Sequence, residues 1–358
     1  MTISKTQFEA AELLDEALNG SGRVRDRAVR LIQEKISTSD LPVQLSPAMT
    51  RILMNRYQEV PSTWTDYAAR MTVDNFESNE HYTFEFGDED IPSKKDGRAF
   101  HSGGLAPIGE LGEYPVIRFT ASGIQLRTQK SGVKIGISWE AIQRSGNVQI
   151  IRRALTEFGE RAKRSENFAA AGQLVNADGI SSNFTNRLDK NPLLSLESLE
   201  AGLAQIAKSK DAKGRRIVVP TSFNLVVPST VAPLAESLMA IREIRRTTAG
   251  GDEYTMSNPV AGKIAKVVEV PELHVLGDGA ADDAWFLLPT VGSGAQDAVV
   301  NVFLSGHETP RVFVKRDTNS SPEDGSFDDD SYETKVRHFV QGGFISDVAT
   351  IASDGSGK

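Results

Sequence analysis

The sequence predicts an α+β fold arranged around one long helix, and three patterns lead to that prediction. Two segments of alternating apolar and polar residues, 114–129 and 133–142, have the period of β-strands. Residues 147–175 follow directly and have the 3.6-residue period of an amphipathic helix. Strand and helix patterns then alternate through residues 191–296, which is typical of a separate α/β lobe, and strand patterns return from residue 297 onward.

The long helix is expected to be the spine of the molecule. About 28 residues rise roughly 42 Å in an α-helix, and Asn147 is placed to be the N-cap. Nothing between residues 114 and 175 has the pattern of a catalytic site, so we expect this region to be structural. The apolar stripe of the helix consists of Ile151, Leu155, Phe158, Ala162, Ser165 and Ala169.

The basic residues of this helix allow two interpretations. A row of cations is compatible with a nucleic-acid-binding face, but Glu157 with Arg161 and Glu160 with Arg164 are i,i+4 pairs in the favourable order. A solvated, self-paired helix surface is therefore the preferred interpretation. Four of the cations also remain candidates for contacts with a neighbouring subunit: Arg152, Arg153, Arg161 and Arg164.

The first 65 residues predict helices and an arm rather than a core. Residues 1–36 have two apolar stripes with a glycine-containing break between them, which predicts two short helices. Residues 37–65 predict an extended arm with one helical turn around residues 48–57, because three prolines interrupt the segment. These prolines are Pro42, Pro47 and Pro61.

A long glycine-rich loop precedes the first strong strand pattern. Residues 87–113 hold six glycines and two prolines, and so long a loop is uncommon inside a compact domain. We expect residues 87–128 to form a projecting hairpin that another subunit supports, since an isolated two-stranded hairpin is marginally stable in water. Cations precede anions along the loop, which suits charge-complementary contacts between copies. The candidate contact residues are Lys94, Lys95, Arg98, Glu110 and Glu113.

The lobe and the C-terminal part are expected to supply the remaining elements. Helix patterns cover residues 195–207 and 229–243. The apolar stripe of the second helix consists of Val231, Leu234, Leu238 and Ile241. Strands are expected at residues 215–219, 224–228, 264–270, 272–277, 284–288, 299–306, 309–317 and 332–351. In the last strand, one face is apolar with Val336, His338 and Val340, and the other is charged.

Composition excludes several classes of protein. The chain of 358 residues has no cysteine, which excludes disulfides, thiolate metal sites and thiol nucleophiles. The formal charge of -8 argues against a dedicated nucleic-acid-binding protein but is compatible with a container around nucleic acid. No apolar run approaches 18 residues and the N-terminus lacks the layout of a signal peptide, so we expect no membrane association and synthesis in the cytoplasm.

No residue pattern predicts catalysis or a bound metal. The acidic residues between 323 and 330 lack the alternating spacing of a calcium loop, and a solvated turn is the preferred interpretation. We therefore expect a protein that is not an enzyme, with no catalytic residue, no metal and no cofactor. The five histidines are isolated, and each is expected to be structural: His81, His101, His274, His307 and His338.

Several stretches resemble the major capsid proteins of tailed bacteriophages, which have the Hong Kong 97-type capsid fold. GELGEYPVIRFTASGIQLRTQKSGVKIGISWEAI and RRALTEFGERAKRSENFAAAGQL are similar to the extended-loop hairpin and spine helix of that family. NLVVPSTVAPLAESLM, NPVAGKIAKVVEVPELHVLG and AWFLL are similar to its axial domain, and FLSGHETPRVFVKRD with KVRHFVQGGFISDVATI to its closing strands. The resemblance covers about residues 65–352 and includes no catalytic motif.

The resemblance implies a division of the chain and a function. The implied parts are N-terminal helices and arm, 1–75; extended loop, 76–130; peripheral domain with the spine helix, 131–190; axial domain, 191–296; and closing strands, 297–358. It implies a structural head protein that assembles into hexamers and pentamers of an icosahedral shell, which encloses double-stranded DNA contacted non-specifically. The implied partners are further copies, a portal, a scaffolding protein or maturation protease, and a decoration protein, with assembly in the bacterial cytoplasm and a final place in the virion.

Some relatives in that family carry a self-made lysine–asparagine cross-link. Lys94, Lys95 and Lys130 are possible donors, but Asn319 is the only asparagine after Asn301 and lies in the acidic loop, so this bond is not predicted. Two alternatives to the capsid remain at this point. One is an encapsulin-like bacterial nanocompartment shell, and the other is a small-oligomer hydrolase or ligand-binding protein with its pocket in residues 191–296.

Overall fold

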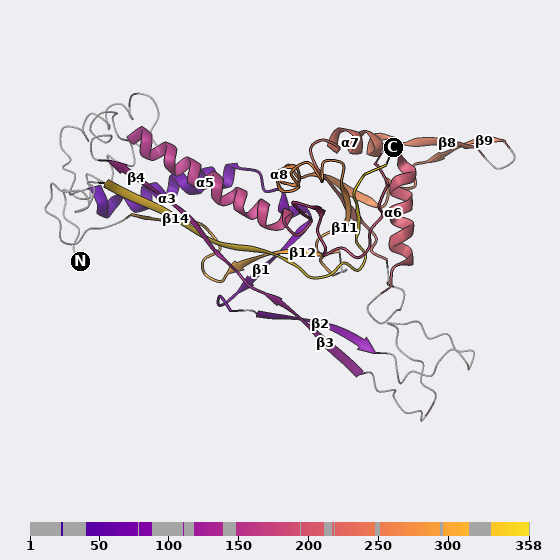
Figure 1. The fold of residues 1–358 in the computed structure, drawn as a ribbon, viewed down its shortest axis with the longest axis horizontal. Coiled ribbons are helices and arrows are strands. Elements are labelled where there is room, and N and C mark those ends of the chain that lie inside the picture. The colour runs from indigo at the N-terminus through magenta and orange to yellow at the C-terminus, as the bar shows by residue number, and fades with distance from the viewer. Residues whose placement is uncertain are drawn as a thin grey trace.

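The computed structural model has an elongated body of sheet and helix at one end, a compact lobe at the other, and a two-stranded ribbon that leaves the body between them (Figure 1). None of the described helices has the length and apolar composition needed to span a bilayer. The structure describes residues 41–77, 79–87, 118–138, 148–193, 195–210, 219–247, 251–293, 296–314 and 331–357, with residues 23, 110 and 217. The predicted helices in 1–36, the Asn147 cap, most of the 87–113 loop and the acidic 323–330 run lie outside these residues.

The predicted spine helix is present as α5 (Val148–Ala171) and packs on the body sheet. It is 24 residues long, shorter than predicted, because the chain turns at Gly172 and continues into the small hairpin β5 (Val175–Asn176) and β6 (Gly179–Ile180). The first half of the predicted stripe is buried at Leu155, Phe158 and Ala162.

The second half of the predicted stripe is wrong. Ser165 and Ala169 are only half-buried, whereas Glu166 and Ala170 are fully buried one position further along. The buried face turns toward Glu166 because side chains from other elements hydrogen-bond its carboxylate, which removes the usual cost of burying a charge.

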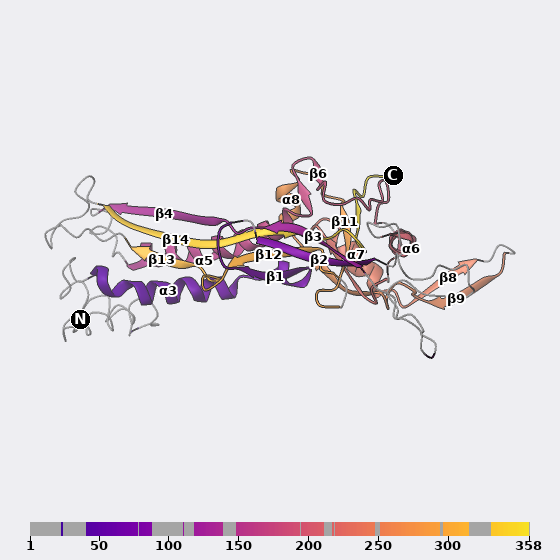
Figure 2. The same cartoon turned by 90° about the horizontal axis from the view of Figure 1, so that it is seen from below.

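The predicted extended arm is also wrong in part. Residues Leu41–Glu59 form a 19-residue helix, α3, which lies along α5 (Figure 2). Met49 and Leu53 are completely buried, so packing against α5 stabilises a helix that the prolines argued against. Pro42 lies in its first turn, where proline is tolerated. A single 3₁₀ turn, η1 (Trp64–Asp66), follows it.

The body sheet joins distant parts of the chain in the order β1, β12, β14, β13, with β4 also paired to β14. β1 is parallel to β12 and the other pairs are antiparallel. As predicted, Val336, His338 and Val340 are buried on one face of β14, the face that packs on α5. The strands are β1 (Ala68–Val73), β12 (Val299–Leu304), β14 (Ser331–Phe344), β13 (Arg311–Val314) and β4 (Lys130–Ser138).

The predicted α/β lobe contains a four-stranded sheet in the order β10, β7, β11, β15. Its central strands are entirely buried, as expected of short apolar runs. The last strand comes from the C-terminal end of the chain, so the sheet is completed from outside residues 191–296. The strands are β10 (Ile264–Glu269), β7 (Phe223–Val227), β11 (Trp285–Pro289) and β15 (Ile351–Ser353), and α6 (Leu196–Lys208) packs beside them.

Three predictions in the lobe are corrected. The helix α7 (Ala232–Ala240) ends before residue 243, and Leu234 and Ile241 of its predicted stripe are 37% and 36% exposed. Val231 and Leu238 of that stripe are buried as predicted, together with Ala232 and Ala235. The predicted strand 272–277 is a short helix, α8 (Glu272–Leu276), since Glu272 is drawn inward by hydrogen bonds. The hairpin of β8 (Glu243–Thr247) and β9 (Glu253–Ser257) was not predicted.

A projecting two-stranded sheet is present, but its first strand lies before the hairpin predicted over residues 87–128. β2 (Asn79–Gly87) pairs antiparallel with β3 (Arg118–Leu126) over nine residues, and no third strand joins them in the part of the chain described. Figure 1 shows this ribbon leaving the body rather than folding back over β4 and β14. Its support by another subunit stays a prediction, as does the division into five parts.

Candidate assembly surfaces

The face of the body sheet that points away from α5 carries several exposed cations. Lys335 and Arg337 lie on this face of β14, and the strand register places three more cations beside them: Lys130, Lys134 and Arg311. The side chain of Lys134 is 71% exposed. One carboxylate, Glu333, lies on the same face and pairs with Lys134 Nζ at 2.9 Å. Positive charge is therefore concentrated here in a chain whose formal net charge is -8.

Aromatic rings lie between these cations. The guanidinium of Arg337 is 4.5 Å from the ring centre of Phe313 and 5.1 Å from that of Phe339. Phe76, which is 52% exposed, packs on Phe339 at 5.4 Å. We call this surface, made of Phe76, Lys130, Lys134, Arg311, Phe313, Lys335, Arg337 and Phe339, the basic sheet face.

The predicted pairs on the spine helix are confirmed. Arg161 Nε donates to Glu157 Oε1 at 2.7 Å, and Arg164 donates to Glu160. Glu160 also accepts from Arg56 of α3 at 3.2 Å, so this pairing reaches across two helices. Arg152 is half-buried and Arg153 exposed, and neither forms an ion pair with another described residue.

Removal of one exposed pair is expected to have a small effect. Arg161→Ala should lower the free energy of unfolding by about 0.3–0.5 kcal/mol, because both side chains are solvated. Urea denaturation at low and high salt measures it, and the loss should shrink as salt screens the pair. A loss above about 2 kcal/mol would mean that Arg161 has a partner beyond Glu157.

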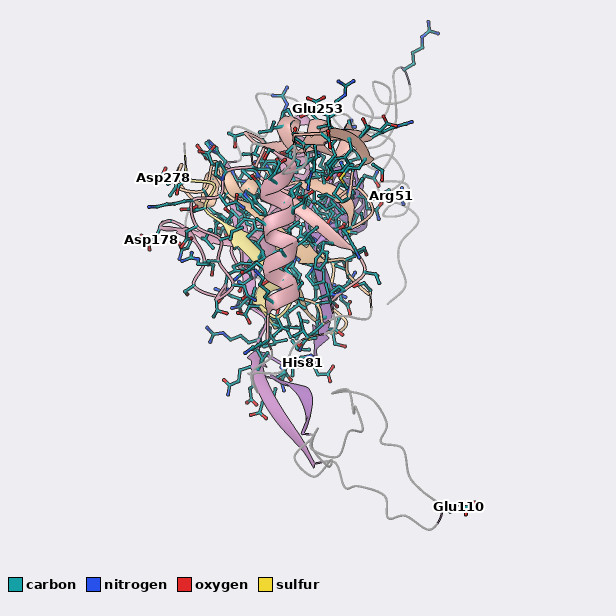
Figure 3. The ribbon with its side chains drawn as sticks, turned by 90° about the vertical axis from the view of Figure 1, so that its right-hand side faces the viewer. Arg51, His81, Glu110, Asp178, Glu253 and Asp278 are labelled. Carbon is teal, nitrogen blue, oxygen red and sulfur yellow. The ribbon has the colours of Figure 1, made fainter. Side chains whose placement is uncertain are left out.

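The predicted contact residues of the long loop are mostly outside the described residues: Lys94, Lys95, Arg98 and Glu113. Glu110 is described; it is exposed and lies far from the body (Figure 3). The role of these residues as subunit contacts therefore stays a prediction.

A buried carboxylate joins the spine helix to the rest of the body. Glu166 is 1% exposed, and its carboxylate accepts hydrogen bonds from four side chains of different elements. Trp64 Nε1 donates at 3.1 Å and Lys163 Nζ at 2.9 Å. Tyr57 of α3 donates its hydroxyl hydrogen, and Nε2 of His338 lies 3.0 Å away. We call these five residues the Glu166 cluster.

The protonation of the cluster follows from its contacts. Burial by itself raises the pKa of Glu166, but the hydrogen bonds from His338 and Tyr57 and the charge of Lys163 outweigh it and hold the pKa below its usual value. Burial beside this carboxylate raises the pKa of Tyr57. Glu166 is therefore an ionised carboxylate at neutral pH, held by donors from both ends of the chain.

Sequence reasoning missed this cluster. His338 was expected to be a structural histidine, and its burial agrees with that, but its partner could not be named. A charged residue one position away from the apolar stripe, at Glu166, was the available signal.

A second buried carboxylate, Glu272, accepts from Asn167 at 2.9 Å and Thr63 at 3.3 Å beside it.

The lobe offers little to the hydrolase or ligand-binding alternative. A cleft of about 420 Å³ opens beside α7 and the C-terminal segment. Asp283 is the one ionisable residue among those that line it, so no set of polar groups converges there. The described residues contain no group of three or more His, Cys, Asp or Glu side chains that would hold a metal ion. The lining residues are Pro192, Leu193, Val231, Leu234, Asp283, Gly355, Ser356 and Gly357.

A comparison with protein families decides between the alternatives. The model of the family described as "Phage capsid protein" matches residues 123–352, nearly two thirds of the chain. The chain belongs to this family. It is a structural major capsid protein, and the resemblance seen in the sequence is confirmed.

This capsid protein has distant structural relatives, and no curated protein matches its sequence. The capsid of Myoviridae phage XM1 is 12% identical with a TM-score of 0.49, over 82% of this chain and 90% of that chain. A virus-like particle from Pyrococcus furiosus is 9% identical with a TM-score of 0.47, over 85% and 97%. The SrpI encapsulin complex from Synechococcus elongatus is 8% identical with a TM-score of 0.41, over 80% and 85%. These TM-scores are too low to carry an argument, so the assignment rests on the family model.

Proposed function

We propose that this capsid protein forms the hexamers and pentamers of an icosahedral shell that encloses the double-stranded DNA of a tailed bacteriophage. The family match is the observation that carries the proposal. The β2–β3 ribbon supports it, because an isolated two-stranded sheet is marginally stable in water and a neighbouring copy is the natural source of its cover.

The proposal includes the partners of such a shell. A portal, a scaffolding protein or maturation protease, and a decoration protein would complete the particle. Contact with DNA would be non-specific. Assembly would take place in the host cytoplasm and the protein would end in the virion, with no enzymatic activity of its own and no cofactor.

Negative-stain electron microscopy with light scattering tests the proposal. The chain is expressed alone and with its neighbouring gene products, and closed shells or hexameric rings are expected. A shell wide enough for a phage genome supports the capsid, whereas a small, nucleic-acid-free shell around a protein cargo would favour the encapsulin alternative. A monomer in the presence of all partners contradicts both.

A further inference from the structure

The cations of the basic sheet face lie opposite one another. In the register of β13, β14 and β4, Arg311 is the partner of Arg337, and Lys335 is the partner of Lys134. Like charges at directly opposed positions destabilise an antiparallel pair of strands. Glu333 balances only part of this charge among the side chains described here, through its bond to Lys134.

The face is also accessible to an anion. Gly132 is the register partner of Arg337, so β4 carries no side chain between its two lysines on this face, Lys130 and Lys134. Both of these lysines and Lys335 are exposed. Ammonium and guanidinium groups bind carboxylates and phosphates in charge-assisted hydrogen bonds. A multivalent anion along this row would therefore relieve the repulsion between the opposed cations.

The connection between β13 and β14 carries the opposite charge. β13 ends at Val314 and β14 begins at Ser331, so both ends of the connection are attached at one end of the basic sheet face. The connection lies outside the described residues, and the sequence supplies its charge. Residues 317–330 contain six carboxylates and no cation. The six are Asp317, Glu323, Asp324, Asp328, Asp329 and Asp330.

These carboxylates can reach the cations of their own copy. Lys335 follows Ser331 by four positions, which is about 13 Å along a strand. A segment the length of 317–330, held at both ends, extends up to about 23 Å from its attachment points. The tether also gives the carboxylates a high effective concentration at the face, so no second molecule is required.

A DNA backbone is the alternative occupant of the same cations. It would meet the six carboxylates attached at the end of the face, and charges of the same sign repel it. The tethered segment is therefore the favoured occupant, and nucleic acid is its competitor.

We propose that the acidic segment 317–330 binds the basic sheet face of its own copy and competes there with nucleic acid. The contact neutralises the opposed cations and keeps the unassembled chain from binding the nucleic acid of the cell. The inference goes beyond the proposed function, because it concerns the chain before assembly and does not depend on the shape of the shell.

Carbodiimide cross-linking of the unassembled chain tests the contact. The reagent joins a lysine amine to a carboxylate in direct contact with it, with loss of water, and mass spectrometry of the digested chain locates the bond. Lys134 with Glu333, whose side chains are 2.9 Å apart, is the internal positive control. Bonds from Lys130 and Lys134 to carboxylates of residues 317–330 are expected.

An equal mixture of ¹⁴N-labelled and ¹⁵N-labelled chains shows which copy supplies the segment. Cross-linked peptides in which both halves carry the same label are expected. Lys208 and Lys263, which are exposed on the lobe, should give no product with the segment. The Lys134–Glu333 product without any bond to residues 317–330, or mainly mixed labels, overturns the inference and leaves the proposed function intact.

DNA binding gives an independent readout. Neutralisation of the segment by Asp328→Asn, Asp329→Asn and Asp330→Asn should tighten the binding of a short DNA duplex to the unassembled chain at least tenfold, measured by fluorescence anisotropy at low salt. Addition of Lys134→Gln and Lys335→Gln should remove this gain, because it removes cations of the basic sheet face. A gain that persists without these lysines would place the DNA elsewhere and overturn the inference.

A matched variant controls for net charge. Asp178→Asn, Glu236→Gln and Asp278→Asn remove the same number of charges at exposed positions, of which Asp178 and Asp278 are labelled in Figure 3. This variant should tighten DNA binding less than threefold. Equal gains in the two variants would mean that only the overall charge matters, which overturns the inference.

Discussion

Glu166→Ala is expected to lower the free energy of unfolding of the capsid protein by about 3–5 kcal/mol. The substitution removes the acceptor of four buried or half-buried donors, and Lys163 and His338 would keep their polar groups in a site with little access to water. Two of the donors, Tyr57 and Trp64, come from the N-terminal segment, so α3 and η1 should detach first.

Urea denaturation of the unassembled chain measures this loss. Glu157→Ala, which removes an exposed carboxylate from the same helix, is the matched control and should cost less than about 1 kcal/mol. Hydrogen exchange should show early opening of residues 41–66 in the Glu166 variant only. Equal effects of the two substitutions would mean that the Glu166 cluster does not hold the N-terminal segment.

The same cluster makes stability depend on acid. The folded pKa of Glu166 lies below its ordinary value of 4.5, so its stabilising effect is fully present above about pH 4.5 and is lost as pH falls through the lower folded value. Glu166→Gln cannot ionise and should lack this acid-dependent loss. Urea unfolding curves of the unsubstituted chain and of Glu166→Gln between pH 3 and pH 6 measure this difference. The free energy of unfolding of the variant should change less with pH.

The elements that could be predicted from the sequence are those whose pattern is local. The spine helix and most of the lobe strands follow from periods of 3.6 and 2 that need no knowledge of the rest of the chain, whereas the strand β2 was not predicted. The helix α3 was missed because its stability comes from packing on α5, more than 90 positions away, and this packing outweighs the prolines.

The basic sheet face and the Glu166 cluster depend even more on residues that lie far apart in the sequence. The basic sheet face collects cations from three strands, and each strand alone looks like an ordinary half-exposed segment. The Glu166 cluster needs Tyr57, Trp64 and His338 to meet, and no spacing rule relates positions 57, 64, 166 and 338. No single segment of the sequence shows these groupings, because the fold brings their side chains together from separate elements.

Gly342→Ala is expected to prevent folding or to cost about 3–5 kcal/mol. Gly342 lies on β14 where the C-terminal end of α5 crosses the sheet. A Cβ at this position would lie 1.8 Å from the carbonyl oxygen of Ala169 and 2.7 Å from its carbonyl carbon. Both are backbone atoms, so relief requires the helix end or the strand to move rather than a side chain to rotate.

Such a movement would reach beyond the substituted residue. The displaced strand also carries His338, which binds Glu166, and cations of the basic sheet face. The stability of the monomer and the yield of assembled particles should therefore both fall. Soluble yield and the urea midpoint measure the effect, with Gly262→Ala as control because its added Cβ meets nothing within 4 Å. The control should change stability by no more than about 0.5 kcal/mol. A Gly342→Ala chain that unfolds at the same midpoint as the control would contradict the close packing of α5 on β14. The geometry of the Glu166 cluster and of the basic sheet face depends on that packing.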